Sequence, residues 1–176
     1  MFLDAYIEHT FYVARAPFFV KFFSVATELG GGLVVAALSI TLAVFWFRQN
    51  RLPYIAGLFV SVVGSGVVAQ IIKYLVERPR PLMPAIVETG YSFPSGHGAA
   101  ALALYGFLVF VIWNTMPPKS RNVWVTLMGT FILLIGFSRL YLGVHYFSDV
   151  VGGYVIGAFF VWLGILISKR VSHQSI

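Results

Sequence analysis

YIAGLFVSVVGSGVVAQIIKYLV, residues 54–76, decides the fold because it is almost wholly apolar and carries one charged residue, near its end. About 17 to 25 such residues are enough for a helix to cross the hydrocarbon core of a membrane. Small residues recur every four positions, at Gly57, Ser61, Ser65 and Ala69. Such a stripe lets helix backbones approach closely. The segment therefore predicts a membrane-spanning helix packed in a bundle.

Four further apolar windows lie at about residues 31–47, 97–113, 123–138 and 150–168. The chain is 59% hydrophobic and only 10% charged, whereas about a quarter of the residues of a soluble domain are charged. Lipid must therefore cover much of the surface. We expect an all-α, polytopic membrane helix bundle of about five transmembrane helices, forming a single integral-membrane domain over residues 1–176.

The N-terminal segment, residues 1–28, has a different composition. Its sequence LDAYIEHTFYVARAPFFVKFF mixes charged residues with aromatic ones, and Pro17 interrupts it. It also lacks a small-residue site at which a signal peptide would be cleaved. These features favour an amphipathic helix that lies in the membrane interface over a sixth span.

Composition also excludes several functions. The chain has no cysteine, which rules out disulfides, zinc–cysteine sites and cysteine nucleophiles. Its net charge of +6 comes from basic residues scattered between apolar windows rather than from a dense run. The expected partners are therefore the membrane bilayer and its anionic lipids, and we expect no nucleic acid.

Three polar stretches are predicted to converge on one face of the membrane. They are KYLVERPRP (73–81), YSFPSGHG (91–98) and SRLYLGVHYFSD (138–149). The second and fourth windows end where the third and fifth begin, so all three stretches fall on the same side. Residues 73–149 therefore form the candidate functional core.

The cations of this core suit a phosphoryl group. Lys73, Arg80 and Arg139 bring three positive charges to a site where a dianion would be attracted. Ser95 and Gly96 stand at the predicted start of the third span. The first N–H groups of a helix lack intrahelical partners and carry partial positive charge, so this start predicts an anion cradle.

Two histidines and a carboxylate supply the groups for catalysis. His97 and His145 can transfer protons, and Asp149 follows His145 by four residues, which would place both on one face of a helical turn. A carboxylate on one imidazole nitrogen fixes the tautomer and leaves the other nitrogen free to attack.

The motifs K-x6-R-P (73–81), P-S-G-H (94–97) and S-R-x5-H-x3-D (138–149) resemble the three signature motifs of the type 2 phosphatidic acid phosphatase superfamily. Vanadium haloperoxidases and bacterial acid phosphatases belong to the same superfamily. The apolar windows that flank the motifs agree with its membrane branch of lipid phosphatases.

The resemblance implies a role for each matching residue. His145 would attack phosphorus and form a phosphohistidine, Asp149 would orient it, and His97 would protonate the leaving oxygen. The implied phosphate-binding groups are Lys73, Arg80, Ser95, Gly96 and Arg139. The family needs no metal or other cofactor for hydrolysis. The implied substrate is a lipid phosphate or diphosphate such as phosphatidic acid, phosphatidylglycerol phosphate or a polyprenyl diphosphate.

The same residues suggest other functions. A metal site from His97, His145, Asp149 and Glu88 is disfavoured, because three nearby cations would repel a dication. A small membrane transporter, or a binding protein for anionic lipids, is the alternative function. Transporters commonly bind at the midplane, however, whereas these polar residues gather at span ends. Glu77 and Arg78 match no motif position and are interpreted as interfacial.

The distribution of basic residues predicts the orientation. Six basic residues lie on each side of the membrane, and four of those on the motif side belong to the polar cluster. Without these four, two basic residues remain on the motif side, against six on the opposite side. Positive loops stay in the cytoplasm, so we expect a cytoplasmic C-terminus and a site on the extracytoplasmic face of a bacterial inner membrane.

Overall fold

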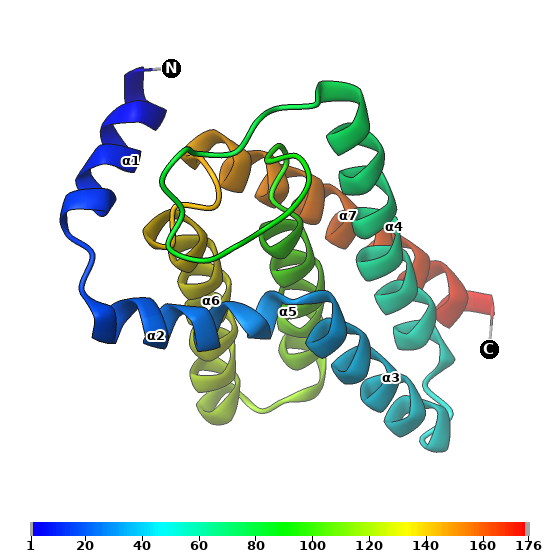
Figure 1. Ribbon diagram of the computed structural model, residues 1–176. Coiled ribbons are helices and arrows are strands. Elements are labelled where there is room, and N and C mark those ends of the chain that lie inside the picture. The colour runs from blue at the N-terminus through cyan, green and yellow to red at the C-terminus, as the bar shows by residue number, and fades with distance from the viewer. Residues whose placement is uncertain (1, 175–176) are drawn as a thin grey trace.

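Helix is the only regular structure in residues 2–174, the part of the chain that the computed structural model describes (Figure 1). The α-helices are α1 (Phe2–Val13), α2 (Pro17–Thr27), α3 (Gly32–Arg48), α4 (Leu52–Val76), α5 (Gly96–Thr115), α6 (Pro118–Tyr141) and α7 (Phe147–Gln174). A short 3₁₀ helix, η1 (Glu28–Gly30), links α2 to α3. Proline stands at the start of α2, α4 and α6, where its missing N–H costs no intrahelical bond. The predicted all-α class is confirmed.

The number of candidate spans is four or five. Helices α4, α5, α6 and α7 are each long and apolar enough to cross a membrane. Helix α3 qualifies only together with α2 and η1, to which it is joined with a bend of 43°. This agrees with the expected number of about five. Helix α1 lies outside the candidate spans, and α2, which Pro17 begins, leads through η1 toward α3. The interfacial location of residues 1–28 stays a prediction.

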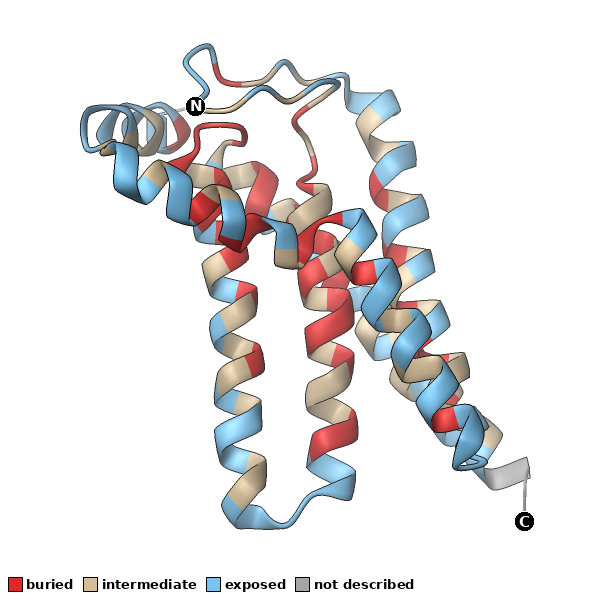
Figure 2. Ribbon diagram, turned by 60° about the horizontal axis from the view of Figure 1, so that its bottom comes forward, coloured by how far each residue is buried: buried red, intermediate tan, exposed pale blue. Residues whose placement is uncertain are grey.

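Helix α5 forms the centre of the bundle. Half of its apolar window is buried inside the protein, against 22–28% in α4, α6 and α7. Figure 2 shows this difference as a concentration of buried positions along α5. The outer helices carry exposed large apolar side chains, among them Phe59, Leu133 and Phe159, as lipid-facing surfaces do.

Small residues bring α4 and α7 into close contact. The stripe predicted on α4 is buried at all four positions, Gly57, Ser61, Ser65 and Ala69. On the facing helix, a Cβ added to Gly164 would collide with the Ser61 hydroxyl and the Gly57 carbonyl. The backbones therefore approach so closely that no larger side chain fits at Gly164, and the predicted role of the stripe in bundle packing is confirmed.

The polar stretches share one end of the bundle. Helices α4 and α6 end where α5 and α7 begin, and the long loop 77–95 crosses this end (Figure 1). Glu77 closes α4 in the left-handed conformation, with φ of 50°. The loop returns to its own start, since the Ser92 N–H donates to the Arg78 carbonyl at 2.8 Å. Helix α1 also lies at this end, opposite the C-terminal part of α7 (Figure 2).

Candidate active site

The start of α5 supplies a backbone cradle. Ser95 is the N-cap, and its side-chain oxygen accepts a hydrogen bond from the Gly98 N–H at 3.2 Å. Its own N–H donates to the Asp149 carbonyl at 2.9 Å, which joins the start of α5 to the start of α7. A Cβ added to Gly96 would meet no atom within 4 Å. Open space therefore lies beside the first turn of α5, where the helix favours an anion.

His145 and Asp149 form a buried pair between α6 and α7. His145 precedes α7, and Asp149 lies in the first turn of that helix with its side chain fully buried. One carboxylate oxygen, Asp149 Oδ2, accepts the Tyr146 N–H at 2.9 Å and lies 3.5 Å from His145 Nδ1. The expected pairing is present, but a loop closed by this cap produces it rather than a continuous helical turn.

The second ring nitrogen of His145 faces the cations. Nε2 lies 3.4 Å from Arg80 Nη1, on the side of the ring away from Asp149. Burial lowers the pKa of His145 to about 4; Arg139 and Arg80 act in the same direction, and Asp149 opposes them. The imidazole is therefore neutral at pH 7. With Nδ1 directed at a carboxylate, Nε2 carries the free lone pair of a nucleophile.

The basic residues of the motifs are held by the surrounding backbone. Arg80 donates to the carbonyls of Val144 at 2.8 Å and of Gly90 and Thr89 at 3.0 Å. Lys73, in the last turn of α4, donates to a carbonyl of the same loop, that of Tyr91, at 2.7 Å. These bonds fix two of the cations before any ligand arrives, which is the preorganisation that anion binding requires.

The remaining motif residues complete the cluster. Arg139, in the last turn of α6, is fully buried and donates to the Thr27 hydroxyl at 3.0 Å. His97, the second residue of α5, lies within electrostatic range of Arg139, His145 and Glu88. The structure thus brings together all eight sequence-predicted site residues: Lys73, Arg80, Ser95, Gly96, His97, Arg139, His145 and Asp149.

Glu88 belongs to the cluster in a role that sequence reasoning missed. Its carboxylate bridges the two arginines, at 3.1 Å from Arg80 Nη2 and in a short contact with Arg139 Nη2. Burial alone would raise the pKa of Glu88, but Arg139 and Arg80 bring it below its ordinary value, so the carboxylate is ionised. An anion therefore already occupies the point between the two guanidinium groups. No spacing in the sequence signals this, because Glu88 lies in an irregular loop.

Arg78 has partners within the cluster that sequence reasoning missed. Its Nη1 donates to Asp149 Oδ1 at 2.6 Å and to the Ser148 hydroxyl at 2.7 Å, and its Nη2 donates to Asp4 at 2.9 Å. Its guanidinium carbon lies 4.2 Å from the centre of the Tyr146 ring. In the sequence, only its position two residues before Arg80 indicates that Arg78 lies near the site.

No group of three or more His, Asp and Glu side chains that could hold a metal ion occurs within the described part of the chain. Glu88, the fourth residue of the disfavoured metal site, is paired with the arginines. The donors at this site thus point to an anionic ligand.

Comparison with known proteins agrees with this arrangement. The family model of the PAP2 superfamily matches residues 54–172. Phosphatidylglycerophosphatase B of Bacillus subtilis is 28% identical over 166 residues, covering 91% of this chain and 80% of that protein. Undecaprenyl-diphosphatase of Sulfolobus acidocaldarius is 28% identical over 138 residues, covering 74% of this chain and 62% of the relative.

A solved structure shows the same fold. The crystal structure of the transmembrane PAP2-type phosphatidylglycerolphosphate phosphatase of Bacillus subtilis superimposes with a TM-score of 0.87 at 26% identity. The match covers 96% of this chain and 85% of the crystallised one. The chain is therefore a member of the PAP2 superfamily and has the membrane-embedded fold of its phosphatases.

Proposed function

We propose that the protein is an integral-membrane lipid phosphatase that removes the terminal phosphate of a lipid phosphate or diphosphate through a phosphohistidine intermediate. The observation that carries the proposal is the His145 ring, which is held between the Asp149 carboxylate at 3.5 Å and the Arg80 guanidinium at 3.4 Å. One ring nitrogen is thereby oriented by a carboxylate, and the other is directed at the groups that would bind a phosphate.

The first chemical step transfers the phosphoryl group to His145. The Nε2 lone pair attacks phosphorus, the bond from phosphorus to the lipid oxygen breaks, and that oxygen takes a proton from His97. Arg80 and Arg139, with the N–H groups at the start of α5, stabilise the charge that develops on the non-bridging oxygens. Asp149 stabilises the imidazolium character of the attacking ring.

The second step releases phosphate. His97, now neutral, takes a proton from water as the water oxygen attacks the phosphohistidine. The bond from phosphorus to Nε2 breaks and returns the lone pair to His145. Phosphate leaves, and the protonated His97 is ready for another lipid.

Glu88 must leave the cradle for this chemistry to begin. Its carboxylate bonds both arginines, and a dianionic phosphate needs the same donors. We infer that substrate displaces Glu88, which lies in the loop 77–95 rather than in a helix. The loop thus provides an internal anion that offsets part of the charge of two cations, one of them fully buried, until a phosphate arrives.

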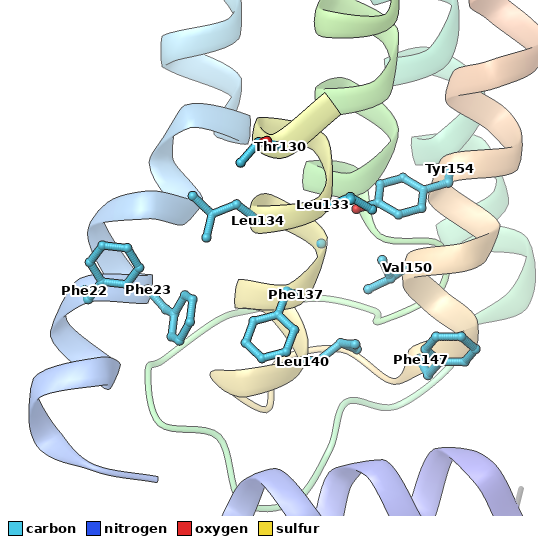
Figure 3. Close-up of a pocket in the computed structure, with 11 residues that line it drawn as sticks. Phe22, Phe23, Thr130, Leu133, Leu134, Phe137, Leu140, Phe147, Val150 and Tyr154 are labelled. Carbon is cyan, nitrogen blue, oxygen red and sulfur yellow. The ribbon is translucent and has the colours of Figure 1, made fainter. Parts of the chain in front are cut away.

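Two features support a lipid substrate. A groove of about 620 Å³ runs between α2, α6 and α7 and is lined almost wholly by apolar side chains, among them Phe137 and Leu140 (Figure 3). Phe147 and Val150 line it from α7, within two residues of Asp149. The relatives named above act on lipid phosphates by their names, and one acts on an isoprenoid diphosphate. We therefore propose phosphatidic acid, phosphatidylglycerol phosphate or polyprenyl diphosphates as the substrate class.

A panel assay with purified protein tests this function. Phosphate release from each of these lipids in detergent or nanodiscs is expected in excess EDTA, with inhibition by vanadate, which can mimic the five-coordinate transition state. His145→Ala should abolish the release. Activity that EDTA removes and magnesium or zinc restores would contradict the proposed chemistry, as would the absence of release from every lipid tested.

We also propose that the single domain lies in a bacterial inner membrane with this site on the extracytoplasmic face. The support is the excess of basic residues at the opposite end once the motif cations are set aside. Single cysteines at Thr89, in the loop 77–95, and at Ser120, near the start of α6, test it. An impermeant thiol reagent on intact cells should label the first. Labelling only at Ser120 would reverse the orientation.

A further inference from the structure

Arg78 bridges two carboxylates that come from opposite ends of the chain. Its Nη1 donates to Asp149 Oδ1 at 2.6 Å, while its Nη2 donates to Asp4 Oδ2, on α1, at 2.9 Å. Because both terminal nitrogens already serve carboxylates, Arg78 is not a spare phosphate-binding cation. The ring of Tyr146, 4.2 Å from the guanidinium carbon, supports it from one face.

The bond to Arg78 determines which way the Asp149 carboxylate faces. Oδ1 is taken by Arg78, which leaves Oδ2 directed at the Tyr146 N–H, at 2.9 Å, and at His145 Nδ1, at 3.5 Å. The Asp149 side chain is fully buried, so water cannot replace a lost donor without entering the protein. Without Arg78, Oδ1 would lose its donor and the Tyr146 N–H would alone hold the carboxylate, so Oδ2 would be fixed less firmly against the imidazole.

Asp4 holds the other side of this bridge. Its Oδ1 accepts the Ser148 N–H at 3.0 Å, and its Oδ2 accepts the Ser148 hydroxyl at 2.7 Å. Helix α7 begins one residue before Ser148, so Asp4 caps the helix that carries Asp149. It is the buried residue of α1. The Ser148 and Arg78 donors outweigh burial and lower the pKa of Asp4 to about 2, so this cap is charged at neutral pH.

We propose that Arg78 is a positioning residue that fixes the Asp149 carboxylate against His145, and that Asp4 on α1 holds Arg78 in place. The proposal rests on the proposed function, because it assigns Arg78 and Asp4 to the same reaction. It makes α1, the helix outside the candidate spans, a part of the catalytic arrangement rather than a membrane attachment alone.

The kinetic test combines Arg78→Gln with Asp149→Asn. Partners that orient a directly acting group typically contribute about 10- to 100-fold to activity. Arg78→Gln should therefore lower kcat by about that factor while KM changes little. If Arg78 acts through Asp149, the same substitution in the Asp149→Asn background should lower kcat by less than about threefold. Arg121→Gln is the matched control, because Arg121 also lies over an aromatic ring, that of Trp113, but near the start of α6, at the opposite end of the bundle.

Three kinetic results would overturn the proposal. An unchanged kcat in Arg78→Gln would show that Arg78 only attaches α1 to the rest of the protein. A raised KM with normal kcat would make Arg78 a substrate-binding group. Losses that multiply in the double variant would show that Arg78 acts independently of Asp149. Asp4→Ala should lower kcat in the same direction by a smaller factor, and it replaces Arg78→Gln if that variant does not fold.

A spectroscopic test separates this proposal from the proposed function. In ¹⁵N NMR spectra of histidine-labelled protein, the His145 ring should be a single neutral tautomer protonated on Nδ1, and Arg78→Gln or Asp4→Ala should give a mixture. An unchanged tautomer in both variants would refute the positioning role, whatever the activity. A wild-type protein that releases no phosphate would refute the proposed function, while the tautomer would still decide the role of Arg78.

Discussion

Replacing Glu88 with Gln should tighten the binding of phosphate. The Glu88 carboxylate bonds Arg80 at 3.1 Å and makes a short contact with Arg139, so an incoming anion has to displace it. Glutamine keeps the shape and one neutral acceptor but removes the charge. The variant therefore asks how strongly this internal anion competes for the cradle.

The size of the effect follows from the bonds that change. A hydrogen bond to a charged group contributes about 1.5 to 3 kcal/mol, and a charge-assisted bond is roughly twice as strong as a neutral one. The substitution weakens the contacts with the two arginines. It thus lowers by about 1 to 3 kcal/mol the free energy that an incoming phosphate needs to displace residue 88. The Glu88 side chain is 23% exposed, and screening by solvent lowers the effect. We expect about tenfold tighter binding, which corresponds to about 1.4 kcal/mol.

Calorimetric titration of purified protein with inorganic phosphate or vanadate measures this difference directly. Glu77→Gln is the matched control, because it changes the net charge equally at the same end of the bundle but on an exposed residue. Its affinity should remain that of the unsubstituted protein. Equal or weaker phosphate binding by Glu88→Gln would refute the reasoning and would make Glu88 a support for the arginines rather than a competitor.

Three further predictions concern the histidines and the packing. His97→Ala should lower the rate on a lipid substrate by about a hundred- to ten-thousand-fold. On p-nitrophenyl phosphate, whose phenolate needs no proton to leave, this variant should recover much of its first-step rate, whereas His145→Ala should recover nothing. Quench-flow measures both rates, and equal recovery would contradict the two assignments. Burial lowers the pKa of His145 to about 4 from its ordinary value of about 6.5, so the fold should lose stability as the pH falls from 6.5 to 4. By NMR the His145 ring should titrate near pH 4, and titration near 6.5 would contradict the effect of burial. Gly164→Val should destabilise the protein by about 1 to 3 kcal/mol, because the valine side chain would meet Ser61 and the Gly57 carbonyl. Thermal unfolding in detergent measures this change, and an unchanged midpoint would show that α4 and α7 are not closely packed at this point.

The sequence predicted the spans well because hydropathy over a long window reports the lipid environment directly. The windows at 54–76 and 97–113 correspond to α4 and α5. The N-terminal segment was harder to interpret. Pro17 looks like an interruption in the sequence, but at the first position of a helix it is compatible with a continuing path.

Within the site, the residues that carry a motif were easier to predict than the residues that hold them. His145 and Asp149 could be paired from their spacing, although the loop before α7 rather than a helical turn brings them together. Asp4 lies 145 residues before Asp149, and no local pattern connects it to Arg78. Such contacts depend on how α1 packs against the start of α7, which the local sequence does not determine.

The most direct test of the account is to trap the intermediate. Acid-sensitive phosphohistidine should accumulate when the protein is mixed rapidly with a ³²P-labelled lipid phosphate and quenched in base within a turnover, and mass spectrometry should place the label on His145. Asp149→Asn should slow its formation, and His145→Ala should form none. Phosphate release with no labelled protein at any time, or a label on His97, would contradict the assignment of His145 as the nucleophile.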